Sequence, residues 1–199
     1  RTLSALVAVA IFLVVGFPVH ECAHALVAYR LGDGTAKLFG RLTLNPLVHL
    51  DPLGSVVLAI SALAGGGGFF IGWAKPTPVN PSMLRGGHRG EAIVAAAGPL
   101  SNLVLAILAA IVIRVFIAVG VTPSPAIEFV GLVITWFLLI NISLFIFNLL
   151  PLPPLDGSKV LFAFLPARTV WQVRPLLEQW GFVILLAAMF FPPGRSIGA

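Results

Sequence analysis

Residues 18–27 read PVHECAHALV and place three polar side chains inside an apolar stretch. His20 and His24 are four residues apart, so on a helix they share one face with Cβ atoms about 6 Å apart. Two imidazoles in that arrangement can bind one zinc ion, and Glu21 can take a proton from a water that the metal holds. This HExxH spacing is the pattern of zinc hydrolases, so the stretch predicts a metal centre on a helix.

The same residues could instead hydrogen-bond to one another at a packed helix interface. That alternative is disfavoured because burying three ionisable groups at membrane depth is costly, and such residues are functional by default. Cys22 fills a variable position of the motif and projects away from the histidine face, which favours a packing role.

Two histidines leave a catalytic zinc short of a third protein ligand. The candidates are His49, His88, Cys22, Asp33, Asp51, Glu91, Glu128, Asp156 and Glu178. Asp156 stands apart because it nearly ends the segment NLLPLPPLDG, whose prolines exclude helix and leave backbone groups open. Irregular backbone near membrane depth is tolerated against protein or a water-filled cavity, where a carboxylate fits as a metal ligand. The alternative is that Asp156 caps a following helix.

The composition indicates the environment of this centre. Of the 199 residues, 59% are hydrophobic and 10% are charged, against about 25% charged residues in soluble domains. The net charge of +5 comes from lysines and arginines that flank apolar segments, so it does not indicate nucleic-acid binding. We expect an integral membrane protein with one domain over residues 1–199, a catalytic core at about 3–165 and a C-terminal helix at 176–191.

Apolar stretches occupy residues 3–31, 53–74, 91–119, 127–150 and 176–191. The second contains four consecutive glycines, residues 65–68, which oppose a continuous helix. It is predicted to re-enter the membrane, although an ordinary span with a flexible middle is the alternative. Residues 36–48 partly alternate in polarity and predict a short strand or hairpin beside the membrane surface. The fold class is therefore an all-α polytopic membrane protein with about four transmembrane helices, a re-entrant segment and a short β hairpin or strand near the active site.

Six blocks occur in order along the chain: HECAH, GRLTLNPL, HLDPLG, GWAKPTPVNP, AGPLSNL and NLLPLPPLDG. Together they resemble the site-2 protease family of intramembrane zinc metalloproteases, in its compact prokaryotic form without a PDZ domain. The resemblance covers roughly residues 15–160. It implies one zinc per chain, held by His20, His24 and Asp156, with Glu21 as the catalytic acid and base. It also implies that Asn148 lies by the active site and steadies the substrate carbonyl, and it matches Asn102 to a family position.

These ligands can meet only if the helices over 3–31 and 127–150 run parallel, which requires that 53–74 does not cross the membrane. The charges agree with that topology. One side then receives Arg30, Lys37, Arg41, Lys75, Arg85, Arg89, Lys159, Arg168 and Arg174, and the other receives Arg1, Arg114 and Arg195. Because cytoplasmic loops carry the excess of positive charge, the active site is expected to face the cytoplasm.

The predicted function is hydrolysis of peptide bonds within or next to the transmembrane segments of membrane-protein substrates, in the inner membrane of a prokaryotic cell. Residues 38–45 are expected to hold the unwound substrate as an added edge strand. The alternative is a membrane transporter that binds a divalent metal without proteolysis, and an inactive scaffold is a third possibility. His49 and His88 are assigned no role; both lie in segments placed near the membrane surface, where a solvated histidine is the leading expectation. The partners are the substrate and the lipid bilayer, with no nucleic acid, and the sequence does not indicate an oligomeric state.

Overall fold

The structure is a computed structural model that describes residues 2–64 and 75–190. These residues form helices joined by turns, without a β-sheet. In chain order the helices are α1 (Thr2–Ile11), the π-helical turn η1 (Phe12–Gly16), α2 (Phe17–Arg30), α3 (Thr35–Leu38), α4 (Pro46–His49), α5 (Pro52–Ala64), the 3₁₀ turn η2 (Pro81–Met83), α6 (His88–Ala118), α7 (Pro125–Asn148), α8 (Asp156–Phe164) and α9 (Ala167–Phe190).

Three stretches of the described chain are long and apolar enough to cross a membrane: Leu3–Arg30, His88–Ala118 and Pro125–Asn148. The first joins α1, η1 and α2 without a break in helical backbone, as the sequence predicts. The π-helical turn η1 lies directly before the HExxH motif, and such turns are frequent at functional sites. A Cβ at Gly16 would lie 2.4 Å from the Phe12 ring, so glycine lets that ring fold over the turn.

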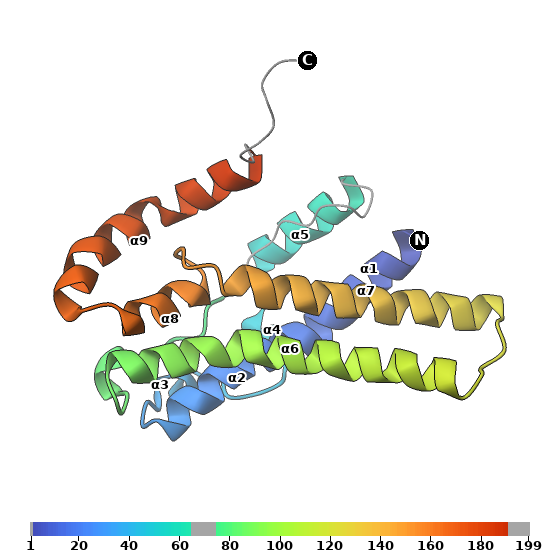
Figure 1. The fold of residues 1–199 in the computed structure, drawn as a ribbon, viewed down its shortest axis with the longest axis horizontal. Coiled ribbons are helices and arrows are strands. Elements are labelled where there is room, and N and C mark those ends of the chain that lie inside the picture. Colours follow the sequence, from blue (N-terminus) through green and yellow to red (C-terminus); the bar gives the residue numbers. More distant parts are fainter. Residues whose placement is uncertain (1, 65–74, 191–199) are drawn as a thin grey trace, which may run out of the picture.

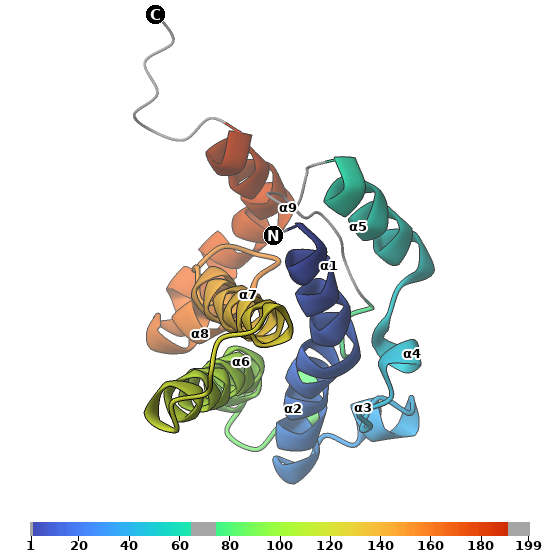
Figure 2. The ribbon, with the colours of Figure 1, turned by 90° about the vertical axis from the view of Figure 1, so that its right-hand side faces the viewer.

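The three spans pack as one group: α6 contacts both α2 and α7, and α7 contacts α1 (Figures 1 and 2). α6 and α7 form an antiparallel hairpin, and α1–α2 runs in the same direction as α7 (Figure 1). The parallel arrangement of the first and third spans is therefore confirmed. Helix α6 begins after Gly86 and Gly87, whose φ values of 87° and 54° suit glycine. Helix α7 is capped by Ser124, whose hydroxyl accepts a hydrogen bond from the Ile127 amide at 3.3 Å.

Of the about four predicted transmembrane helices, the described residues contain three candidates by length and composition. The C-terminal stretch is helical, but α9 is not among the described helices that qualify as spans. Its first half carries Arg168, Arg174 and Glu178, and Pro175 lies inside it. Charged residues are enriched at the membrane surface rather than in its core, so this half of α9 suits the interface.

Residues 36–48 do not form the predicted strand or hairpin. They contain α3 and the start of α4, joined by a turn at Gly40 with a φ of 67°. The Asn45–Pro46 pair, which lies inside the predicted strand or hairpin, begins a helical turn. Asn45 Oδ1 accepts a hydrogen bond from the Leu47 amide at 3.1 Å, and Pro46 takes the first helical position. The expectation that residues 38–45 add a substrate strand to an existing edge therefore loses its basis.

The described part of α5 has 13 residues, about 20 Å of helix, and the residues that follow Ala64 lie outside the described part of the chain. Its first turn is capped by Asp51, which accepts a hydrogen bond from the Gly54 amide at 2.9 Å. Beyond it the chain returns to the same place, because the Lys75 amide donates to the His49 carbonyl at 3.1 Å. The two ends of this segment therefore lie close together, which favours the predicted re-entrant arrangement. The glycine run at 65–68 lies outside the described residues, so its turn stays a prediction.

Candidate metal centre

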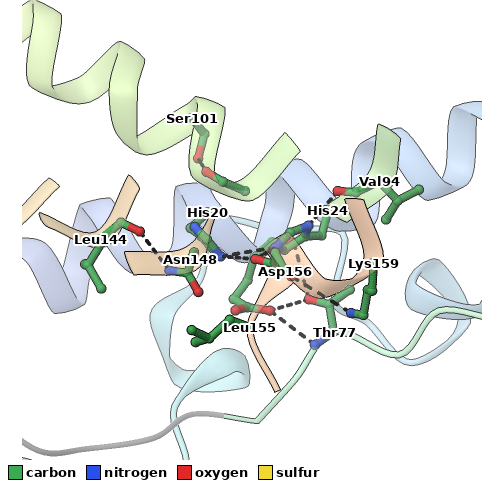
Figure 3. Close-up of polar contacts among 12 residues, drawn as sticks. His20, His24, Thr77, Val94, Ser101, Leu144, Asn148, Leu155, Asp156 and Lys159 are labelled. Atoms are coloured by element: carbon green, nitrogen blue, oxygen red, sulfur yellow. Dashed lines mark hydrogen bonds and ion pairs between the residues drawn. The ribbon is translucent and has the colours of Figure 1, made fainter. Parts of the chain in front are cut away.

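Three side chains from two helices converge on one point (Figure 3). His20 and His24 come from α2, and Asp156 comes from the first turn of α8. The two Nε2 atoms lie 3.1 Å apart, and Asp156 Oδ2 lies 3.5 Å from that of His20 and 3.2 Å from that of His24. Both histidines are buried. Among the described residues this is the one cluster of three such groups that could hold a metal ion.

These separations fit tetrahedral zinc. Zinc bonds of about 2.0–2.2 Å to nitrogen and oxygen place neighbouring donors roughly 3.3–3.5 Å apart. The donor separations of 3.1, 3.2 and 3.5 Å lie close to that value. Three protein ligands also leave one position of a tetrahedral site for water or substrate, as catalytic zinc requires.

Helix α6 orients the histidines from behind. His24 Nδ1 donates to the Val94 carbonyl at 2.7 Å, which leaves Nε2 free to bind a metal. One turn further along α6, a Cβ on Gly98 would lie 2.2 Å from His24 Nε2 and 2.6 Å from His20 Cε1. Glycine is therefore required at this position, because any side chain would displace both imidazoles.

Asp156 is placed by the turn after α7. The alternative in which it caps α8 is wrong, because Leu155 occupies the cap position and Asp156 is the first helical residue. A Cβ on Gly157 would lie 2.2 Å from the Leu149 carbonyl oxygen, so glycine allows α8 to start against the end of α7. Burial alone would raise the pKa of Asp156, but hydrogen bonds to His20 and His24 outweigh it and hold the pKa below its ordinary value.

Glu21 is buried, and its carboxylate forms hydrogen bonds with Thr77 in the segment 75–80. Its Oε2 accepts hydrogen bonds from the Thr77 hydroxyl at 2.6 Å and from the Thr77 amide at 3.1 Å. Thr77 was not singled out from the sequence. The signal was present, since Thr77 lies between Pro76 and Pro78 in one of the six blocks, but nothing local indicates which side chain it meets.

Three other residues considered from the sequence are not part of the metal cluster. Asn148 ends α7, and one of its amide hydrogens is donated to the Leu144 carbonyl at 3.1 Å, while Figure 3 shows its side chain in the surroundings of the triad. Asn102 is fully buried, and its Oδ1 has no partner among the described residues. Cys22 lies outside the metal cluster.

The interpretation of His49 as solvated is wrong, because it is fully buried with its ring edge against Phe17. His49 Nε2 donates to the Thr43 carbonyl at 2.8 Å, so the histidine forms a hydrogen bond with the loop after α3 instead of with solvent water. His88 has a side chain that is 54% exposed and lies 3.7 Å from Glu91, as expected for a solvated histidine.

Two histidines and an aspartate gathered at one point, with a glutamate next to the first histidine, define a metal-dependent hydrolase built into a helical membrane protein. Comparison with known proteins agrees. The sequence profile of Peptidase family M50 matches residues 115–190, which include Asn148 and Asp156. The "Putative zinc metalloprotease YwhC" of Bacillus subtilis is 39% identical over 189 residues, 94% of this chain and 82% of that protein.

More distant relatives show the same class. The proteins named "Putative zinc metalloprotease Rip2" from Mycolicibacterium smegmatis and Mycobacterium tuberculosis strain H37Rv are 35% and 32% identical over 173 residues. This chain spans 62% of their length. No solved structure matches it. The chain belongs to peptidase family M50, the site-2 protease family, and is a zinc metalloprotease of the membrane.

Proposed function

We propose that this protein hydrolyses peptide bonds within or next to the transmembrane segments of other membrane proteins. The observation that carries the proposal is the position of His20 and His24, two of the three metal-binding residues, on Leu3–Arg30, a helix that is long and apolar enough to cross a membrane. His20 lies 17 residues after Leu3, about 26 Å along the helix, against a hydrocarbon thickness of about 30 Å. A peptide bond that reaches this centre lies in a membrane-embedded segment or at its edge.

His20, His24 and Asp156 would hold the zinc ion, one per chain. When bound, zinc lowers the pKa of a water to about 7 and polarises the substrate carbonyl. Glu21 accepts the proton of the attacking water and returns it to the leaving amine, the general acid–base role that its place beside His20 permits. The second amide hydrogen of Asn148, which its own helix does not use, supports a role in steadying the carbonyl oxygen.

The side of the membrane follows from charge. If residues 53–74 are re-entrant, nine lysines and arginines lie on the same side of the membrane as the triad. The other side has three, namely Arg1, Arg114 and Arg195. This bias supports an active site that faces the cytoplasm in a prokaryotic inner membrane. The substrate would be a transmembrane protein or peptide. Its helix would have to unwind locally, because the carbonyl groups of a helix are engaged in backbone hydrogen bonds and cannot reach the metal.

The test compares purified wild-type protein with Glu21→Gln on candidate single-span membrane proteins, with and without a zinc chelator. The substitution keeps the shape of the side chain and removes its capacity to carry the proton. Cleavage should fall by at least about 10²-fold, the lower range for general acid–base catalysis, while zinc stays near one per chain.

A Glu21→Gln protein that cleaves at the wild-type rate would contradict the role of Glu21. Wild-type protein that binds zinc but cleaves no membrane substrate would contradict the protease proposal. A non-proteolytic metal transporter would show that second outcome, and its transport would survive the substitution.

A further inference from the structure

Residues 75–80, which we call the strap, pass along α2 and are anchored at three points. At the start, the Lys75 amide donates to the His49 carbonyl at 3.1 Å. At the end, the Asn80 amide donates to Asp33 Oδ2 at 2.7 Å, and Asp33 is fully buried just beyond α2. In the middle, Thr77 contacts Glu21. The two outer anchors set the height of the strap against α2, so the position of Thr77 is determined from both sides.

Thr77 places two donors on one oxygen of the Glu21 carboxylate. The hydroxyl lies 2.6 Å and the amide 3.1 Å from Oε2, and the hydroxyl also lies 3.3 Å from the backbone oxygen of Glu21. A hydroxyl has one hydrogen to donate, so we assign the hydrogen bond to the shorter of the two contacts, the one to Oε2. Oε1 receives neither of these hydrogen bonds.

The prolines on either side restrict the backbone of Thr77. Pro76 and Pro78 have fixed φ angles and no amide hydrogen, and Pro78 also favours extended backbone at Thr77. The Thr77 amide is thus the one amide hydrogen between residues 76 and 78. A restricted backbone loses little further freedom when it holds the carboxylate.

We propose that Thr77 is a positioning residue for the general acid–base reaction: it holds Glu21 by Oε2 and thereby presents Oε1 to the proton that is exchanged. This inference rests on the proposed protease function. Free rotation about the side-chain bonds of a glutamate would spread Oε1 over several places, and a near-attack arrangement tolerates little displacement. The same oxygen then takes and returns the proton while the carboxylate stays in place.

A purely structural role would look different. If Thr77 served only to keep the strap on α2, its loss would lower stability and would act like the loss of any other strap contact. The chain offers a matched control at the far anchor, because the Thr35 hydroxyl donates to Asp33 Oδ1 and has no contact with Glu21 among the described residues. Thr35→Val removes the same chemical group from the residue that holds Asp33, the far anchor of the strap.

The first experiment measures kcat, KM and bound zinc for three variants. Thr77→Val keeps the shape and the amide but removes the hydroxyl, and kcat should fall by about 10- to 100-fold, as for losing a hydrogen bond to a charged group, with KM and zinc unchanged. Thr77→Ser restores the hydroxyl and should return kcat to within about threefold of wild type. Thr35→Val should lower thermal stability and leave kcat unchanged. Equal losses for Thr77→Val and Thr77→Ser, or no loss for Thr77→Val in an active protein, would overturn the proposal.

The second experiment needs neither zinc nor activity. Amide hydrogen exchange of a peptide over residues 76–78 in zinc-free protein reports the Thr77 amide alone. Its exchange should quicken at least about tenfold in Glu21→Ala, because the acceptor is gone. It should not change in Glu128→Ala, an exposed acid in the first turn of α7. Unchanged exchange in Glu21→Ala would refute the contact itself. Failure of the protease function is recognised separately, by wild-type protein that cleaves nothing.

Discussion

The two halves of α6 differ in what surrounds them. The first half buries a face of small and polar residues against α2 and α8, among them Glu91, Val94, Gly98 and Asn102. The second half exposes large apolar side chains, and Ile111 is 52% and Ile117 67% exposed. The first half positions chemical groups and tolerates little change in volume, since neighbours fit within tenths of an ångström. The second half contacts α7 on one face and suits lipid on the others, so shape matters less there.

The largest expected effect comes from removing a ligand at the packed end. Asp156→Ala takes one of the three donors and leaves two histidines, fewer than catalytic zinc uses. Bound zinc should fall from about one per chain to a small fraction after dialysis, and cleavage should be lost with it. Elemental analysis of the purified protein measures this. Stoichiometric zinc in the Asp156→Ala protein would remove that residue from the metal centre.

The next effect comes from a single methyl group. In Gly98→Ala the new Cβ would lie 2.2 Å from His24 Nε2, so the imidazole must move. Zinc affinity should fall by about 10- to 100-fold, as when a group that orients a ligand is lost. Gly131→Ala is the matched control, because a Cβ there meets nothing within 4 Å, and this helical position in α7 should be neutral or slightly stabilising. Equal zinc affinity in both variants would contradict the close approach of α6 to the histidines.

Sequence reasoning succeeded where a pattern is local. The histidine spacing depends on helical periodicity alone, and the three spans depend on apolar length, so both could be predicted from single segments. Asp156 followed from its proline-rich context and from the family resemblance.

What failed depended on contacts between distant segments. Asn45–Pro46 suits either the end of a strand or the start of a helix, and only the packing of the loop decides between them. His49 gives no local sign of burial, because its partner ring is Phe17 and its hydrogen bond goes to Thr43. The Thr77–Glu21 contact joins residues 56 positions apart. Nothing in either local sequence encodes such a pairing.

A smaller effect is expected at the outer anchor of the strap. Asp33 accepts hydrogen bonds on both oxygens, from Thr35 on one and from the Asn80 amide on the other. Asparagine has only one acceptor oxygen, so in Asp33→Asn the side-chain NH2 group would face the donors of either Thr35 or Asn80 and could not accept their hydrogen bonds. The free energy of unfolding in detergent should therefore fall by roughly 1–3 kcal/mol.

The pH dependence of that loss gives a second readout. Burial would raise the pKa of Asp33, but the Thr35 hydroxyl and the amides of Asn80 and Thr35 lower it below its ordinary value. A carboxyl group with a lowered folded-state pKa stabilises the protein above its unfolded pKa of about 3.9, and this stabilisation is lost as the pH falls through the folded value. The difference between wild type and Asp33→Asn should therefore be constant above about pH 5 and shrink below about pH 4. A difference that grows on acidification would contradict the assignment.

A final pair of substitutions separates the two halves of α6 directly. Val94 is 4% exposed and packs with Ala28 and Leu84, whereas Ile111 is half exposed. Val94→Ala should lower the free energy of unfolding by roughly 1.5–3 kcal/mol, because the buried methyl groups lose their neighbours and leave a cavity. Ile111→Ala removes more carbon but should change it by less than about 0.5 kcal/mol, because lipid or detergent fills the space. Denaturant titration in one detergent compares them. A larger loss for Ile111→Ala than for Val94→Ala would show that a further surface covers the second half of α6, and the contrast between the halves would then be wrong.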